Sequence, residues 1–134
     1  MIKIQKTKTN IGFVSKIYHI ADIHIRLLKR HNEYREVFDR LYEYIRNTKD
    51  DNSIICLLGD IVHSKTDMSP ECFQMQSELY SNLAKLCPTI VITGNHDANL
   101  SNINRLDALT PIVNSLNHPN LHYWKDTGVY RMGG

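Results

Sequence analysis

The sequence is 134 residues long, with 42% hydrophobic and 22% charged residues, which is typical of one globular domain. It contains six glycines and four prolines, too few for a collagen or a low-complexity chain. No apolar run approaches the roughly 20 residues that span a bilayer. The first residues lead into no apolar stretch, so we expect neither a membrane segment nor a signal peptide.

The net charge of +2 is distributed unevenly along the chain. Residues 1–35 carry eight Lys or Arg and two Asp or Glu, whereas residues 36–134 carry eight and twelve. A basic leading segment is typical of polyanion binding and also of a solvated terminus. Charge alone therefore leaves both interpretations open.

The three cysteines, Cys56, Cys72 and Cys87, are widely spaced and lie in apolar runs or helix-like segments. This pattern favours buried, reduced thiols over disulfides or metal ligands. Reduced thiols are typical of a reducing compartment. We therefore expect a cytoplasmic or nuclear protein that is not secreted.

The first half of the sequence alternates apolar runs with an amphipathic segment. Residues 16–21 are short and apolar and predict a strand. Apolar residues recur every three or four positions within residues 33–48, which predicts an amphipathic helix. Residues 53–58 form a continuous apolar run ended by Gly59, as in a strand buried on both faces.

The second half repeats this alternation. Ser69 and Pro70 predict the start of a helix, as its N-cap and first helical residue, and the helix should end before Pro88. Residues 89–93 predict a third buried strand. The remaining predicted elements are a helix over residues 102–116, kinked or split at Pro111, and two strands at residues 121–124 and 129–132 around a turn.

This order of elements predicts an α/β fold whose strands run parallel and are joined by right-handed crossovers. In such sheets the ligand site lies outside the carboxyl ends of the strands. The residues that directly follow the three apolar strands are therefore the first candidates for chemistry.

Carboxylate, imidazole and amide side chains follow all three strands. The three motifs are Asp22-x-His24, Gly59-Asp60-x-x-His63 and Gly94-Asn95-His96-Asp97. Carboxylate oxygens and imidazole nitrogens suit divalent metals such as Mn²⁺, Fe²⁺ and Zn²⁺. Each motif alone also occurs in ordinary polar loops. Three in succession, each closing a strand, predict a metal site.

The motifs resemble the first three motifs of the calcineurin-like metallophosphoesterases. The residues around Asp22 and Asp60 further resemble the DNA-repair exonuclease subunits of the SbcD type, and the resemblance covers about residues 16–132. It implies a β-sandwich flanked by helices (αββα), of which residues 1–134 would form the N-terminal part. It also implies a two-metal hydrolase, a DNA exonuclease or endonuclease of double-strand-break repair or recombination.

By this resemblance, Asp22 and His24 bind the first of two divalent ions, Asp60 bridges both, and Asn95 binds the second. The family's nucleases imply Mn²⁺, with Fe²⁺, Zn²⁺ and Mg²⁺ as the alternatives. Two ions of this kind bind both the attacking water and a phosphate oxygen.

The resemblance also assigns catalytic and substrate-binding residues. His96 would protonate the leaving oxygen or stabilise charge on the phosphate. His63 would contact the substrate phosphate, as would Asn95. Independently of the resemblance, Arg26 follows the first motif, where a contact to backbone phosphate would suit it, although a solvated loop is the slightly favoured interpretation. The implied partners are DNA, an ATPase subunit of the SbcC type and a second copy of the chain, with no membrane.

One departure from the family pattern concerns the distal histidines. The family completes its site with a Gly-His and a later Gly-His-x-His, whereas only His118 and His122 follow His96 here, in a different context. The chain therefore holds at most half of the implied ligand set, and we expect that the isolated 134 residues can be inactive.

Two alternatives stay open beside the nuclease. One is a phosphatase or phosphodiesterase acting on nucleotides, proteins or other small phosphates. The other is a non-catalytic scaffold or an incomplete fragment without the distal histidines. Because residues 1–134 would hold about the first half of the larger fold, we expect a sheet face or edge normally covered by the missing part to be exposed here, or to be covered by another copy of the chain.

Overall fold

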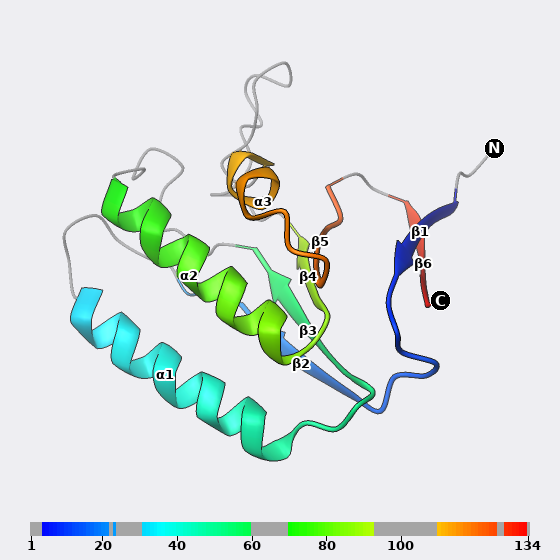
Figure 1. Cartoon of the computed structure of the whole chain (residues 1–134), viewed down its shortest axis with the longest axis horizontal. Coiled ribbons are helices and arrows are strands. Elements are labelled where there is room, and N and C mark those ends of the chain that lie inside the picture. The colour runs from blue at the N-terminus through cyan, green and yellow to red at the C-terminus, as the bar shows by residue number, and fades with distance from the viewer. Residues whose placement is uncertain are drawn as a thin grey trace.

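Figure 1 shows the computed structural model, which describes residues 4–21, 23, 31–59, 70–92, 110–125 and 128–133. The elements within these ranges are β1 (Ile4–Lys8), β2 (Lys16–Ile20), α1 (His31–Thr48), β3 (Ser53–Leu58), α2 (Pro70–Leu86), β4 (Thr89–Ile92), α3 (Thr110–Leu116), β5 (Leu121–Tyr123) and β6 (Val129–Gly133).

The central feature is a sheet of four strands in the order β2-β3-β4-β5. Each neighbouring pair is parallel, and α1 and α2 connect successive strands. The predicted α/β class with parallel strands is confirmed. The three apolar runs form parallel strands because the crossover helices return the chain to the same end of the sheet each time.

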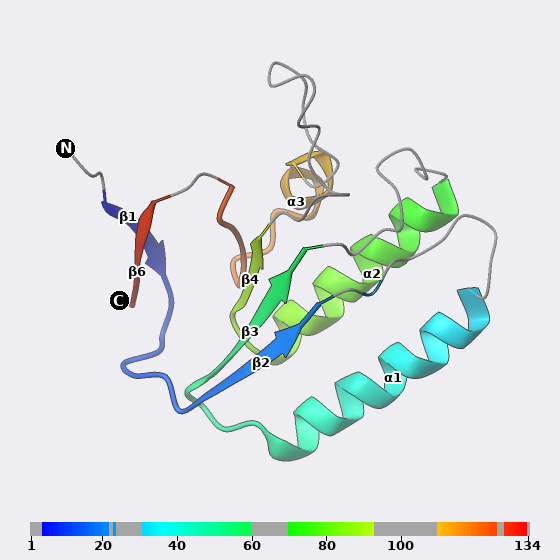
Figure 2. The ribbon, with the colours of Figure 1, turned by 180° about the vertical axis from the view of Figure 1, so that it is seen from behind.

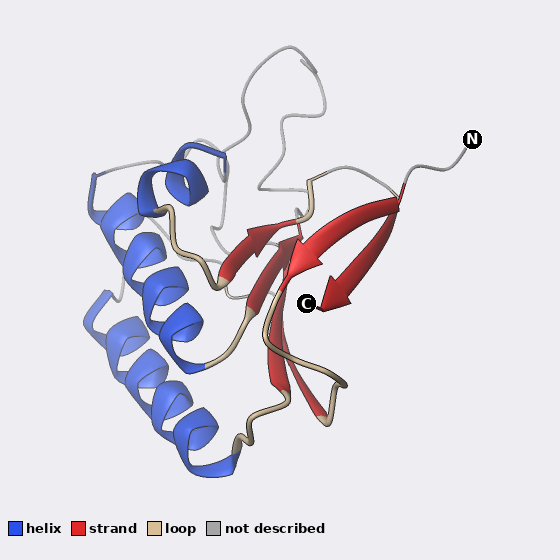
Figure 3. Ribbon diagram, turned by 45° about the vertical axis from the view of Figure 1, so that its right-hand side comes forward, coloured by secondary structure: helices blue, strands red, loops and turns tan. Residues whose placement is uncertain are grey.

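All three helices cover one face of this sheet (Figure 3). The largest core cluster lies between the helices and that face, and it includes Ile55, Leu57 and Val91, which are completely buried. Leu79 and Leu83 of α2 are equally buried in the same cluster. The predicted helix over residues 33–48 and the start at Pro70 are confirmed, because their apolar stripes supply this core.

A second, two-stranded sheet lies beyond the opposite face of the central sheet (Figure 3). Strands β1 and β6 pair in parallel, so the sheet joins segments from near the two ends of the chain. A smaller core cluster contains the buried Ile11, Ile54 and Ile90, against which Trp124 and Met132 pack. The indole Nε1 of Trp124 donates a hydrogen bond to Thr7 Oγ1 over 2.8 Å, which ties β1 to the end of β5.

The structure adds detail to the predictions for the last third of the chain. Residues 102–109 of the predicted helix 102–116 lie outside the described residues, and the described part forms α3, in which Pro111 is the second residue, where its missing N–H costs little. The strands predicted at residues 121–124 and 129–132 exist, but they belong to different sheets. A turn between two strands does not by itself pair them.

Candidate metal centre at the strand ends

The candidate site begins where β2, β3 and β4 end. Ile20, the last residue of β2, pairs with Leu57, and Leu58, the last residue of β3, pairs with Ile92, the last residue of β4. The carboxyl ends of the three strands therefore lie at one edge of the sheet within about one residue of each other, as in a parallel sheet with aligned crossovers. Asp22, Asp60 and Asn95 follow these ends by two, two and three residues in the sequence.

Gly59 has a structural role at this edge. It directly follows β3, is buried, and has a backbone φ of 85°, a conformation that residues with a Cβ rarely adopt. The chain therefore turns sharply just before Asp60. The predicted strand therefore ends before Gly59, as the sequence indicates.

The residues predicted to bind metal or substrate, or to act in catalysis, lie outside the described residues. They are Asp22, His24, Arg26, Asp60, His63, Asn95 and His96. Their assignment stays a prediction, and the structure contributes the strand ends that precede them. Within the described ranges, no three His, Cys, Asp or Glu side chains gather into a second candidate centre for a metal ion.

The chemistry of this donor set fits divalent metals. Two carboxylates, one imidazole and one amide supply oxygen and nitrogen ligands of the kind that Mn²⁺, Fe²⁺ and Zn²⁺ accept. The aligned strand ends and the turn at Gly59 are also consistent with a metal site, because all three motifs follow strands that end at the same edge of the sheet.

The described thiols do not compete as ligands. Burial raises the pKa of the Cys56 thiol, and burial likewise raises the pKa of Cys87, so both stay protonated near neutral pH. A metal ligand needs the thiolate. Both cysteines are free, as the sequence predicts, and the side chain of Cys72 lies outside the described residues.

The remaining histidines near the sheet are not gathered at the strand ends. His19 is exposed in β2, and His118 accepts a hydrogen bond from the Asn120 backbone N–H over 3.1 Å. His122 lies in β5, and burial lowers its pKa. His122 pairs with Ile90, two residues before the end of β4, so it lies away from the edge where the motifs begin.

The sequence matches the calcineurin-like phosphoesterases over residues 15–132, which is most of its length. The chain belongs to the calcineurin-like phosphoesterase family. It is thereby a member of a hydrolase family whose members generally bind two divalent metals.

The chain is similar to parts of two longer proteins. The uncharacterized protein R555 of Acanthamoeba polyphaga mimivirus is 51% identical over 127 residues, which cover 93% of this chain and 9% of the viral protein. The crystal structure of Pseudomonas putida nuclease MPE has a TM-score of 0.52 at 18% identity, covering 84% of this chain and 49% of the nuclease chain. The second likeness confirms the fold.

Sequence reasoning missed an apolar pocket beside the first motif. Ile23, between Asp22 and His24, lines it together with Tyr34 and Phe38 of α1. The sequence did contain a signal for this pocket, because the apolar stripe on α1 includes Val37. That stripe is wider than the part of the helix that the core covers, and Val37 is exposed.

No helix in the described ranges is long and apolar enough to cross a membrane.

Proposed function

We propose that this chain contributes the first half of the metal centre of a two-metal phosphodiesterase that cleaves DNA. The observation that carries the proposal is the alignment of three parallel strand ends, each followed by one of the three motifs. Membership of the phosphoesterase family supports the hydrolysis of a phosphate ester. The resemblance to SbcD-type subunits and the basic residues 1–35 support DNA as the substrate.

In this proposal each motif has a separate task. Asp22 and His24 would hold one divalent ion, Asn95 would hold a second, and Asp60 would serve as a ligand shared by both. Mn²⁺ is the proposed metal, and the ions, when bound, supply Lewis acidity toward phosphate and lower the pKa of water. His96 carries the proton that the leaving oxygen requires.

Two further side chains are proposed to bind substrate. His63 and Arg26 contact phosphate oxygens, and the neutral amide of Asn95 adds a contact without adding negative charge beside the phosphate. Charge-assisted hydrogen bonds of this kind position the DNA backbone and carry no sequence information. We therefore expect cleavage with weak sequence preference.

The test is cleavage of end-labelled linear DNA by the full-length polypeptide with Mn²⁺. Asp60→Asn should lower the rate about a thousandfold or more, because a shared ligand of both ions loses its charge. Asp51→Asn removes an exposed carboxylate in the turn before β3 and should leave the rate unchanged. A folded, Mn²⁺-loaded protein that leaves DNA intact would refute the nuclease.

The salt dependence separates DNA from small phosphates as the substrate. DNA binding that releases counterions weakens steeply as salt rises, whereas hydrolysis of a mononucleotide changes little. We expect DNA cleavage to fall at least tenfold between about 50 and 200 mM salt. Equal salt responses, with faster turnover of nucleotides, would favour the phosphatase alternative.

We further propose that residues 1–134 are the N-terminal part of the catalytic domain, and that the complete protein is a dimer bound to an ATPase of the SbcC type. The chain spans about half of the nuclease chain it matches, which supports the first statement. The resemblance of the motifs to SbcD-type subunits supports the second. Sedimentation of the full-length protein with and without the ATPase tests the proposed dimer and its partner. A monomer that binds no ATPase would contradict this second statement.

A further inference from the structure

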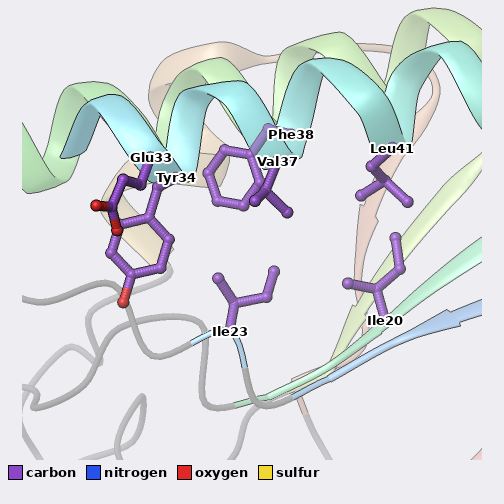
Figure 4. A pocket seen from close by; sticks show the side chains of 7 residues that line it. All are labelled: Ile20, Ile23, Glu33, Tyr34, Val37, Phe38 and Leu41. Carbon is purple, nitrogen blue, oxygen red and sulfur yellow. The ribbon is translucent and has the colours of Figure 1, made fainter. Parts of the chain in front are cut away.

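Two pockets in the described part of the chain differ in the chemistry of their walls. The pocket of about 380 Å³ beside α1 is lined mainly by apolar side chains, and Figure 4 shows Ile20 and Ile23 across from the side chains of the helix. A second pocket, of about 280 Å³, is lined mainly by polar and aromatic residues of β1, β5 and β6. It is called the β1–β5 pocket below. Apolar walls suit the packing of further side chains, whereas polar walls suit a ligand that forms hydrogen bonds.

The β1–β5 pocket lies between the two sheets. Figure 1 and Figure 2 both show the pair β1–β6 on the side of the molecule away from α1. Gln5 and Tyr130, which are opposite each other in this pair, line the pocket from the two-stranded sheet. His122 and Trp124 line it from β5 and the residue after β5. The Trp124 backbone N–H donates to the Val91 carbonyl over 3.0 Å, so the pocket adjoins the end of β4, which the third motif follows in the sequence.

Two aromatic rings in the wall of this pocket form a stack. The rings of Trp124 and Tyr130 are nearly parallel, at 13°, and their centroids lie 4.5 Å apart. The hydrogen bond from the indole Nε1 of Trp124 to Thr7 Oγ1 holds the larger ring in place. Planar heterocycles such as nucleobases stack on aromatic side chains, and each such contact strengthens binding about tenfold. The pair, called the aromatic stack below, therefore suits a flat ligand.

A buried polar atom of the same pocket has no hydrogen-bond partner among the described residues. It is the Nε2 atom of His122. Burial lowers the pKa of this histidine, so the ring is neutral near pH 7 and offers one donor and one acceptor. Gln5, whose side-chain amide also donates and accepts, lines the same pocket. A ligand with donors and acceptors along one planar edge, as a nucleobase has, matches these groups and satisfies the buried atom.

The outer face of the two-stranded sheet carries positive charge beside the pocket. Thr7 faces the central sheet, as its hydrogen bond to the indole shows, so strand alternation places Lys6 and Lys8 on the outer face. Arg131 lies opposite Lys6 in the register, and all three cations are exposed. Strands β1 and β6 contain no acidic residue, and within the described ranges none of the three cations forms an ion pair. This set, called the basic face below, attracts phosphate groups.

We propose that the β1–β5 pocket binds one unpaired nucleotide of a single DNA strand, with the base against the aromatic stack and the phosphates along the basic face. Lys6 belongs to both features, because it lines the pocket and is part of the basic face. A duplex would meet the charges but keeps its bases paired inside the helix, whereas a single strand offers both groups. The proposal rests on the proposed function for DNA as the substrate, and it concerns a site apart from the metal centre.

The fluorescence of Trp124 tests the base contact, since it is the only tryptophan among the 134 residues. Residues 1–134 are titrated with a labelled oligothymidylate of about 12 nucleotides in EDTA, which removes metal and so prevents cleavage. We expect saturable quenching by the single strand and none by a duplex of the same length, because only an unpaired base stacks on the indole. Unchanged emission while the labelled strand is bound, or equal quenching by the duplex, would overturn the proposal.

Substitutions in the full-length polypeptide test both halves of the site, with the anisotropy of the labelled strand in EDTA as the readout. Tyr130→Ala should weaken single-strand binding about tenfold, from the lost stacking. Lys6→Gln should also weaken it and should reduce the slope of log affinity against log salt by about 0.7, the value for one phosphate contact. The matched variants Tyr44→Ala and Lys85→Gln alter exposed positions of α1 and α2 and should leave the affinity unchanged.

Each remaining outcome has one reading. If Tyr130→Ala fails to fold, the exposed Lys6→Gln and the Trp124 emission decide. Single-strand affinity that neither substitution changes would overturn the proposal, as would equal quenching by thymidine monophosphate, which identifies a mononucleotide site. DNA cleavage with Mn²⁺ but no quenching would overturn this proposal alone, whereas quenching without cleavage would overturn the nuclease alone.

Discussion

The two faces of the four-stranded sheet differ in how completely they are covered. On the helix-covered face Ile55, Leu57 and Val91 are fully buried along the length of the strands. On the opposite face Ile54 and Ile90 are buried beneath the smaller cluster, but Leu58 is 40% exposed and Ile92 is 36% exposed. The open part of this face adjoins the strand ends where the motifs begin. The fully buried apolar core and the more exposed apolar side chains therefore lie on different faces of the sheet.

The largest expected change in unfolding free energy comes from one of two neighbouring leucines, which lie on opposite faces of the sheet. Leu57→Ala removes a fully buried side chain and should lower the free energy of unfolding by about 2–5 kcal/mol, from lost burial and the cavity left behind. Leu58→Ala, one residue further on the opposite face, should cost less than about 1 kcal/mol. Urea unfolding of residues 1–134 measures both. Equal losses would show that the two faces are equally covered.

A smaller effect tests how the two-stranded sheet is held to the opposite face. Trp124→Phe keeps an aromatic ring next to Tyr130 but removes the indole N–H and its hydrogen bond to Thr7. We expect a loss of about 0.5–1.5 kcal/mol in unfolding free energy, the usual net value of such a bond. Thr7→Val should cost a similar amount, and the double variant should cost less than the sum. Fully additive losses would contradict the coupling.

The smallest effect is a pH dependence on the opposite face. The Nε2 atom of His122 is buried without a hydrogen-bond partner in the described part of the chain, and burial lowers the pKa of this histidine below its ordinary 6.5. The unfolded chain then binds the proton more readily, so the free energy of unfolding is highest above pH 6.5. It should decline as the pH falls from 6.5 through the lower pKa of the folded protein.

Chemical unfolding at pH 5 to 8 checks this expectation. His122→Gln should flatten the decline, while the matched variant His19→Gln, at an exposed position of β2, should keep it. A decline that is unchanged in His122→Gln would assign the pH dependence to other groups.

Local pattern predicted the elements that position the site. Strand β3 and the turn at Gly59 follow from a continuous apolar run ended by glycine, because burial and backbone freedom are properties of the residues themselves. The order of the motifs along one sheet edge follows from the crossover rule. These features need no information from distant parts of the chain.

Other features depend on partners far away in the sequence. Strand β1 reads Ile-Gln-Lys-Thr-Lys and has no apolar run, so it exists as a strand through its pairing with β6. The apolar pocket escaped prediction because the exposure of Val37 depends on where β2 ends relative to α1. Sequence patterns show which residues are apolar but not which of them remain uncovered.

The central proposal is that Asp22, Asp60 and Asn95, which follow the three strand ends in the sequence, form a metal centre. Electron paramagnetic resonance of Mn²⁺ titrated into residues 1–134 tests it most directly. Because the chain supplies about half of the ligand set, we predict that it binds one Mn²⁺ weakly and that Asp60→Asn abolishes the binding. Asp51→Asn should bind Mn²⁺ like the unaltered chain. Folded protein that binds no Mn²⁺, or that binds it equally after Asp60→Asn, would contradict the claim.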